Sequence, residues 1–271
     1  MNSKNIQQYF KTLAWPAIVV AVYLFVNLLF NVGAGIVMWG APKADAGLCI
    51  SVALLGSSVV TSLLLLGYKP LGLDTGYRRL GCDKRTAAVA MLAIVAGLQV
   101  SDILNDLLDL PNLLEETFSS MIHTVWGVLA IAVFGPVCEE LVFRAGIMKP
   151  MLRAGATPWS AILTSAAVFG LIHGNPAQIV FAMLVGVVFG IVYARTGSLV
   201  ITTACHIFNN TLSVILMLLY SGEEENLTAE KVFGGKLNTF IVLLVSAAIC
   251  LVLLRIVWKR TQSAAANPQL S

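Results

Sequence analysis

Three pairs of residues, each spaced by four positions, lie in otherwise apolar stretches of the chain. The pairs are Glu140 with Arg144, Phe169 with His173, and His206 with Asn210. The whole sequence contains three histidines, and two of them belong to these pairs. Ionisable side chains are costly inside a bilayer, so those in hydrophobic spans usually face a bundle interior or a wet cavity and have a function. These residues are therefore the first candidates for chemistry.

Two adjacent carboxylates belong to the first cluster. Glu139 and Glu140 point about 100° apart on a helix, so we expect them to have different roles. Glu140 precedes Arg144 by one turn, the favourable order for a helix ion pair, and this pair is predicted to be structural. Glu139 is then the free carboxylate, and Pro136 is expected to open space beside it by disrupting the helix and pressing against residue 132. The alternative is that both glutamates only pair with Arg144 at a helix end.

The candidate residues are expected to lie at matching depths. Glu139 and His173 lie 17 residues before and after a turn near Ala156, which places both about 20–25 Å from that turn on antiparallel helices. His206 and Asn210 share a helix face about 10–20 Å from the turn before their own span. The depths overlap, which predicts one polar layer. The alternative is that each histidine or asparagine makes only an interhelical hydrogen bond.

Side chains of these types, brought together, are suited to hydrolysis. A glutamate and a histidine can polarise a water molecule, with the carboxylate taking its proton as general base. A second histidine and an asparagine amide are donors suited to the oxyanion that forms on attack at a carbonyl. The set therefore predicts cleavage of an amide bond, in an aqueous recess lined by polar helix faces.

The stretches around these residues are predicted to cross a membrane. The chain is 58% hydrophobic and 11% charged, with a mean hydropathy of +0.86, whereas soluble domains contain roughly 25% charged residues. Apolar runs of about 20 residues can cross a hydrocarbon core about 30 Å thick as helices, and the alternation of membrane strands is absent. The predicted spans are Leu13–Trp39, Ala46–Gly67, Thr86–Leu104, His123–Arg153, Thr157–Gly174, Pro176–Arg195, Ser198–Tyr220 and Leu237–Trp258.

The predicted fold class is therefore an all-α, polytopic membrane protein of about eight transmembrane helices. No internal repeat or long linker divides the sequence, so residues 1–260 are expected to form a single domain with a motif-bearing core at 123–220, followed by a disordered tail at 261–271. The segment Asp102–Met121 mixes acidic and apolar residues and is predicted to form a pair of short amphipathic helices at the outer interface. The first apolar run is expected to be a retained span and not a cleaved signal peptide.

Most basic residues lie on one side of the predicted spans, and the acidic residues lie mainly on the other, together with Lys43, Lys231 and Lys236. By the positive-inside rule both termini are predicted to be cytoplasmic, in an integral protein of the plasma membrane. The net charge of +3 comes from these membrane flanks, so no nucleic-acid partner is expected. The basic loop residues are Lys69, Arg78, Arg79, Lys84, Arg85, Lys149, Arg153 and Arg195, and the last outer loop contains Glu223, Glu224 and Glu225.

Five cysteines are scattered along the chain without a Cys-x-x-Cys pair, and we expect them to be reduced packing residues. Cys138 and Cys205 are sequence neighbours of Glu139 and His206, which leaves a thiol nucleophile as an alternative. A catalytic thiol needs a base within hydrogen-bond reach. Neighbouring residues on a helix point about 100° apart, which argues against that alternative.

At these residues the chain resembles the CPBP family of intramembrane proteases, also called the CAAX protease and bacteriocin-processing or Abi family, which includes the prenyl-protein endopeptidase Rce. The resemblance lies in Glu-Glu-x-x-x-Arg at Glu139–Arg144, Phe-x-x-x-His at Phe169–His173 and His-x-x-x-Asn at His206–Asn210, in the family's order. Each motif alone is weak, whereas three in order on hydrophobic spans are specific. They cover Val125–Ile215, about a third of the chain.

The resemblance implies an eight-helix, glutamate-dependent endopeptidase that hydrolyses a peptide bond of a membrane-associated protein or peptide. Its partners would be a protein or peptide substrate, with a lipid modification left open, and membrane lipids. The implied roles are water activation by Glu139 with His173, the oxyanion hole by His206 and Asn210, cavity lining by Phe169, and structural support by Glu140 and Arg144.

Three alternatives remain open. Glu139, His173 and His206 could form a His₂Glu zinc site with one open position, but His-Glu-x-x-His is absent and Asn210 suits an oxyanion better, so we expect no cofactor. A proton-coupled transporter could use the same residues as a relay, but would usually show an internal repeat. A non-enzymatic immunity or scaffold protein would tolerate loss of Glu139.

Overall fold

The computed structural model describes residues 3–67, 80–220 and 228–266, and these ranges contain helices and no strand. Seven of the described helices are long and apolar enough to cross a membrane. The chain is thus an all-α, integral multi-pass membrane protein, as predicted. The predicted basic loop at Lys69, Arg78 and Arg79 and the acidic loop at residues 223–225 lie outside the described residues.

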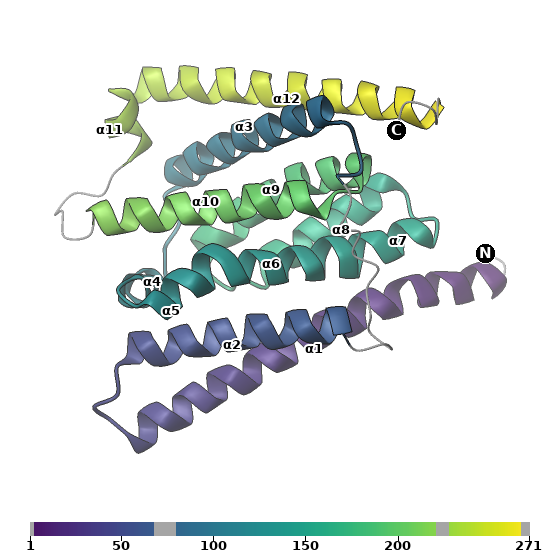
Figure 1. The fold of residues 1–271 in the computed structure, drawn as a ribbon. Coiled ribbons are helices and arrows are strands. Elements are labelled where there is room, and N and C mark those ends of the chain that lie inside the picture. The colour runs from purple at the N-terminus through teal and green to yellow at the C-terminus, as the bar shows by residue number, and fades with distance from the viewer. Residues whose placement is uncertain (1–2, 68–79, 221–227, 267–271) are drawn as a thin grey trace. The chain divides into compact units, whose positions relative to one another are not determined.

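Figure 1 labels the helices along the chain. By their contacts they form two compact groups. The first group contains the described residues within Met1–Thr75, Leu114–Thr157 and His206–Ser221, and the second contains those within Gly76–Leu113, Pro158–Cys205 and Gly222–Ser271. The fourth predicted span lies in the first group. Its five consecutive segments are α5 (Val125–Leu129), η1 (Ala130–Phe134), α6 (Gly135–Glu140), η2 (Leu141–Met148) and α7 (Lys149–Arg153).

In the first group, α2 (Ala46–Gly67) packs against α1 (Ser3–Gly40), against the short α4 (Glu115–Ile122) and against the fourth span. Gly56 permits the close approach of α1, because a Cβ atom there would lie 2.3 Å from a ring carbon of Phe30. Small residues at membrane helix interfaces allow such close packing, here of the Phe30 ring on the glycine. The hairpin of α1 and α2 is therefore fixed against the span that carries the two glutamates.

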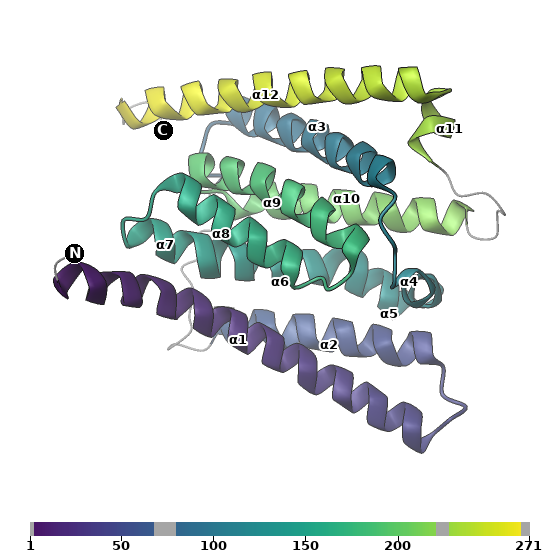
Figure 2. The same cartoon turned by 180° about the vertical axis from the view of Figure 1, so that it is seen from behind.

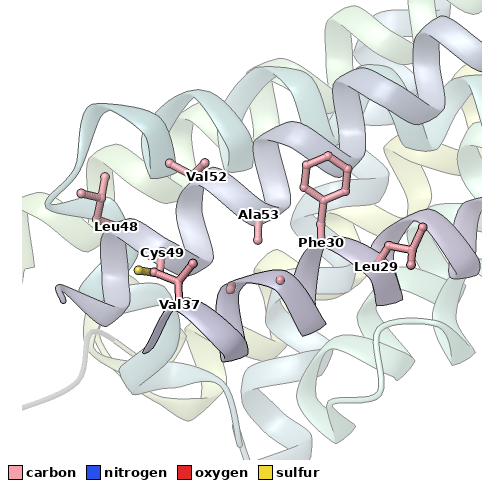
Figure 3. Close-up of a pocket in the computed structure, with 9 residues that line it drawn as sticks. Leu29, Phe30, Val37, Leu48, Cys49, Val52 and Ala53 are labelled. Atoms are coloured by element: carbon pink, nitrogen blue, oxygen red, sulfur yellow. The ribbon is translucent and has the colours of Figure 1, made fainter. Parts of the chain in front are cut away.

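An apolar groove of about 500 Å³ lies between α1 and α2 (Figure 3). Its lining is almost entirely hydrocarbon, so it suits a hydrocarbon chain and not the polar transition state of hydrolysis. The lining residues are Leu29, Phe30, Gly33, Ala34, Val37, Leu48, Cys49, Val52 and Ala53.

The second group is built around α9 (Pro176–Thr196). Helix α8 (Pro158–Leu171) packs beside α9, and α3 (Lys84–Leu108) packs against both α9 and α12 (Lys236–Ala266), as Figure 2 shows. Short α11 (Ala229–Phe233) precedes α12. The buried core contains Ile94, Phe189 and Val257, together with Ile201 and Cys205 from the first turns of α10 (Leu199–Tyr220).

Three helix ends of the second group meet at one place. Gly81, before α3, lies so close to the carbonyl of Thr196 that a side chain there would clash with it. Arg195 lies over the Trp258 ring, with its guanidinium carbon 4.3 Å from the ring centroid, and donates from Nε to Thr261 Oγ1 at 3.0 Å. The start of α3 and the ends of α9 and α12 are therefore on one side. The basic residues at these ends are Lys84, Arg85, Arg195, Lys259 and Arg260.

The N-terminus of α3 is capped by Asp83. Its carboxylate accepts hydrogen bonds from the backbone N–H groups of Arg85 at 2.9 Å and Thr86 at 3.1 Å. The Thr86 hydroxyl also donates to it, and these hydrogen bonds hold the pKa of the Asp83 carboxyl below its ordinary value. An aspartate in this position satisfies backbone donors that have no partner within the helix.

The fifth predicted span differs from the structure. Helix α8 has 14 residues and ends at Leu171, so its length of about 21 Å is less than the hydrocarbon thickness of about 30 Å. The helix stops because Gly174 has a φ of 63° and because Asn175, before Pro176, is disfavoured in a helical conformation. About eight crossings remain plausible, seven by long helices and one by this short helix.

Two other boundaries also differ. Helix α3 continues to Leu108, where Asp109 adopts a left-handed conformation with a φ of 46°. The predicted amphipathic pair in Asp102–Met121 is therefore wrong in its first half, because residues 102–108 extend the preceding span, and α4 alone is a separate helix. Helix α12 continues to Ala266, into the predicted tail, and residues 267–271 lie outside the described part of the chain.

Candidate active site

The fourth span is not a regular α-helix. The short α6, which ends at Glu140, lies between the π-helical segments η1 and η2, and each π segment is followed one residue later by a proline, Pro136 or Pro150. A proline lacks an N–H and its ring clashes with the carbonyl four residues earlier, and the wider π turn relieves this clash. The predicted disruption at Pro136 is confirmed, and it takes the form of a widened turn. Such π turns often occur at functional sites.

Glu140 and Arg144 form the predicted ion pair. Arg144 Nε donates to Glu140 Oε2 at 3.2 Å, and the two side chains are 0% and 1% exposed. Removing one member of such a buried pair leaves the other charge uncompensated, at a cost of about 3–5 kcal/mol. The pair therefore needs to be complete for the site to fold.

His206 of α10 lies between the two glutamates. Its Nδ1 atom is 3.2 Å from Glu140 Oε1, and its Nε2 atom is 3.5 Å from Glu139 Oε2. The two carboxylates, which were expected to have different roles, therefore contact the same side chain. The two ring nitrogens lie on opposite edges of the imidazole, so carboxylates that point about 100° apart can both reach it. A neutral ring donates to one of them and an imidazolium donates to both.

The two glutamates differ in their access to water. The Glu139 side chain is 19% exposed, whereas that of Glu140 is 1% exposed. A general base must meet a water molecule, and a carboxylate engaged by a buried guanidinium is poorly placed to do so. Within the first group, Glu139 is thus the carboxylate suited to chemistry and Glu140 is suited to support.

Asn210 lies one turn after His206, and both the nitrogen and the oxygen of its side-chain amide make hydrogen bonds. Its Nδ2 atom donates to the backbone carbonyl of Ile131 at 3.0 Å, and its Oδ1 atom accepts from Asn209 Nδ2 at 3.2 Å. Asn209 had no predicted role, yet it orients the Asn210 amide. Because an amide nitrogen carries two hydrogens, the contact with Ile131 uses one and leaves a second N–H on Asn210.

His173 lies in the turn after α8, in the second group. Its Nδ1 atom lies 2.7 Å from the carbonyl oxygen of Phe169, and because a carbonyl only accepts, Nδ1 must carry a proton. The Nε2 atom of the neutral ring then has the lone pair that a base requires. The Phe169 and His173 rings meet edge to face, with centroids 5.0 Å apart. Phe169 is 2% exposed and packs against Gly186 of α9, so in this group it supports His173.

Asn175, two residues after His173, was not predicted. It is 0% exposed, accepts from the Leu113 N–H at 3.0 Å and donates to Asn112 Oδ1 at 2.8 Å. An asparagine before a helix with proline at its first position suggests a helix cap, but the Asn175 side chain makes no capping hydrogen bond. Its hydrogen bonds instead join the turn that carries His173 to the loop after α3.

The predicted meeting of Glu139 with His173 would join the two groups, and it stays a prediction. The first group by itself brings together Glu139, Glu140 and His206, and it places Asn210 one helical turn after His206. The cysteines are free thiols, and Cys138 and Cys205 are 0% and 2% exposed. A nucleophilic thiol needs access to substrate, which these two lack.

Comparison with known proteins gives two findings. Residues 121–212 match the family described as "Type II CAAX prenyl endopeptidase Rce1-like". The Bacillus subtilis (strain 168) protein "Putative membrane peptidase YdiL" is 29% identical over 91 residues, which are 34% of this chain. The matched segment spans 37% of the length of that relative. No solved structure matches the chain.

Proposed function

Because residues 121–212 match the family described as "Type II CAAX prenyl endopeptidase Rce1-like", we propose that the chain hydrolyses a peptide bond of a membrane-associated protein or peptide. The observation that carries the proposal is the accessible Glu139 carboxylate, which lies 3.5 Å from His206. Behind it, the buried Glu140 and Arg144 hold the imidazole. A partly exposed base beside a fixed donor is the arrangement that water activation and oxyanion stabilisation require.

In the proposed reaction, Glu139 takes a proton from a water molecule and the resulting hydroxide attacks the carbonyl carbon of the peptide bond. The Nε2 atom of His173 is the second basic atom of the site and orients the same water. The tetrahedral oxyanion accepts hydrogen bonds from His206 Nε2 and from the second N–H of Asn210. Collapse of the intermediate expels the amine, which receives the proton held by Glu139.

This scheme sets a requirement on His206. If Nδ1 donates to Glu140 while Nε2 donates to the oxyanion, the ring must carry both protons. The carboxylate of Glu140 lies 3.2 Å from Nδ1 and supplies the negative charge that such an imidazolium needs. Glu140 therefore supports the proposed donor and does not itself touch the substrate.

A zinc-dependent peptidase is the second candidate, and one distance favours it. Glu139 Oε2 and His206 Nε2 are 3.5 Å apart, which is close to the separation of two ligands on a tetrahedral zinc with bonds of about 2.0–2.2 Å. His173 would have to supply the third ligand, although the described residues contain no group of three His, Cys, Asp or Glu side chains that could hold a metal ion. In that case the metal would activate the water and Glu139 would be a ligand in place of a base.

Two partners accompany the proposal. The substrate is a protein or peptide, with or without a lipid modification, in the plasma membrane or at its surface. Membrane lipids are the other partner, and the apolar groove between α1 and α2 suits one of their acyl chains. A proton-coupled transporter and a non-enzymatic scaffold remain the competing classes.

Cleavage of a quenched fluorescent peptide library by the detergent-purified full chain tests the proposal. The samples are the wild type, Glu139→Gln, and the control Glu115→Gln, which changes an exposed carboxylate of α4. Cleavage that is lost only in Glu139→Gln and persists with a strong chelator supports the glutamate mechanism. Loss with chelator and recovery with added zinc favours the metal. Equal cleavage by all three proteins contradicts the proposal.

A further inference from the structure

The backbone of the fourth span has a carbonyl that the helix itself cannot satisfy. In η1 the hydrogen bonds join residues five apart, and the Gly135 N–H accordingly donates to the Ala130 carbonyl. The next bond of this pattern would join the Ile131 carbonyl to the N–H of residue 136. Residue 136 is proline and has no N–H, so the Ile131 carbonyl lacks its donor in the turn.

In a regular α-helix the Gly135 N–H would donate to the Ile131 carbonyl. Here it donates to the Ala130 carbonyl instead and cannot satisfy Ile131. The Gly135 backbone lies so close to the Ala130 carbonyl that a Cβ atom would be 2.8 Å from that oxygen. The widened turn thus needs glycine at position 135, and the Gly135 N–H is committed to Ala130. An unsatisfied carbonyl in a membrane span costs several kcal/mol, so another group must supply a donor.

Asn210 supplies it, at 3.0 Å from Nδ2 to the Ile131 oxygen. The orientation of the amide is set by chemistry, since a carbonyl only accepts, and Asn209 donates to the other end of the amide. One turn earlier on the same face of α10, His206 contacts Glu139 and Glu140. Helix α10 is therefore attached to the fourth span at two points.

We propose that Asn210 replaces the N–H deleted by Pro136, and that this bond sets the register of α10 so that His206 faces the two glutamates. Two attachment points one turn apart fix both the rotation of α10 and its position along the span. Asn210 is then a positioning residue for His206 in addition to its role as an oxyanion donor. The positioning role rests on the proposed function, whereas the backbone bond does not.

A double-mutant cycle between positions 136 and 210 tests the bond directly. Pro136→Ala restores an N–H to residue 136, so the backbone can satisfy the Ile131 carbonyl with either helical spacing. We expect Asn210→Ala to lower the melting temperature of the wild type by several degrees, and of the Pro136→Ala protein by less than half as much. Equal losses in both backgrounds would overturn the proposal, since independent sites are additive. Leu212→Ala, which shortens an exposed side chain of the same helix, is the matched control, expected to have the same effect in both backgrounds.

Asn210→Asp keeps the proposal testable if Pro136→Ala does not fold. The carboxyl group that it introduces can donate to the Ile131 carbonyl only when protonated, and repels it when ionised. Its deficit in melting temperature relative to wild type should therefore shrink as the pH is lowered from about 8 to about 5, the direction in which a carboxyl gains its proton. A deficit that does not change with pH would contradict the bond.

Kinetics on a cleaved peptide then test the positioning of His206. In the wild type, Asn210→Ala removes both the oxyanion donor and the attachment, whereas in the Pro136→Ala background it removes the donor alone. We expect a smaller fold-loss of kcat in that background, with KM little changed in either. An equal fold-loss would leave Asn210 an oxyanion donor only and refute positioning. If wild type cleaves nothing, the proposed function fails while the thermal cycle still decides the bond.

Discussion

Glu140 links a buried cation to the proposed oxyanion donor. One of its oxygens lies 3.2 Å from Arg144 Nε and the other lies 3.2 Å from His206 Nδ1. A carboxylate with both oxygens engaged is held in one rotamer, and it holds the imidazole in turn. The residue predicted to be structural support thus also orients a group of the candidate site.

Glu140→Ala should lower both the stability and the activity of the protein. It leaves Arg144 buried without its carboxylate, at a cost of about 3–5 kcal/mol. Thermal unfolding in detergent and peptide cleavage measure the two losses. The double variant Glu140→Leu with Arg144→Met separates them, because an apolar pair removes the buried charge. We expect it to regain stability and stay inactive, and recovery of full activity would show that Glu140 does not orient His206.

His173→Asn should abolish turnover without changing stability. The asparagine Nδ2 atom can still donate to the Phe169 carbonyl, as His173 Nδ1 does at 2.7 Å, but the variant lacks an equivalent of Nε2. Loss of a general acid–base group typically lowers the rate by about 10²–10⁴-fold. The kcat and the melting temperature are measured on the same preparation. Wild-type turnover in this variant would remove His173 from the mechanism.

At the scale of elements, the turn between α8 and α9 is held by Asn175, a residue that was not predicted to have a role. Irregular backbone within a membrane protein needs partners from the protein itself. Asn175 provides one for the Leu113 N–H, and Ala177 N–H donates to the Pro111 carbonyl. The loop after α3 and the turn that carries His173 therefore form one hydrogen-bonded unit.

Asn175→Ala should lower the melting temperature and reduce kcat more than it changes KM. It leaves the Leu113 N–H without its acceptor, at a cost of about 1–3 kcal/mol, and it frees the turn two residues after His173. Asn112→Ala is the matched comparison, because it removes the acceptor of Asn175 Nδ2 but keeps the acceptor of the Leu113 N–H, and it should have the smaller effect. Equal kcat values for wild type and Asn175→Ala would show that the turn does not position His173.

Helix ends could be predicted from the sequence where the apolar run and the helix stop at the same residue. The bounds of α2 match the predicted Ala46–Gly67, since an apolar run there stops at polar flanks. The end of α8 was missed because hydrophobicity continues to Gly174, while the helix is ended by the positive φ of that glycine. The π turns were not predicted, because the choice between bonds four and five residues apart depends on how Pro136 is accommodated against a neighbouring helix.

At the scale of the whole molecule, one structural observation agrees with the distribution of charge to which the positive-inside rule was applied. In the second group the start of α3 and the ends of α9 and α12 meet, and each has basic residues beside it. The three ends must therefore face the same compartment. The sequence predicted this gathering from charge alone.

Both termini should face the cytoplasm. The prediction requires the short α8 to complete a crossing, since seven crossings would place the termini on opposite sides. The orientation is measured in bacterial cells by fusing each terminus to two reporters. One is a protein that fluoresces in the cytoplasm, and the other is an enzyme that is active in the periplasm. Reporters that place the termini on opposite sides would show that α8 does not cross.

The residue types of the candidate site stay a prediction, and only part of the geometry that the structure shows around them was predicted from the sequence. The spacing of Glu140 and Arg144 gave their ion pair because it is local to one helix. The position of His206 between the two glutamates was not predicted, because it depends on the register of α10 against another span. The hydrogen bond from Asn210 to Ile131 depends on the same register. Contacts between helices are set by packing, which spacing within one helix does not encode.

The most direct test of the account is the kcat of Glu139→Gln on a peptide that the wild-type protein cleaves, measured beside its melting temperature. Glutamine keeps the size and hydrogen-bonding reach of Glu139 and cannot take a proton from water. We expect kcat to fall by about 10²–10⁴-fold or more, with the melting temperature of the wild type. A folded Glu139→Gln protein with kcat close to that of the wild type would contradict the central claim that Glu139 activates the water.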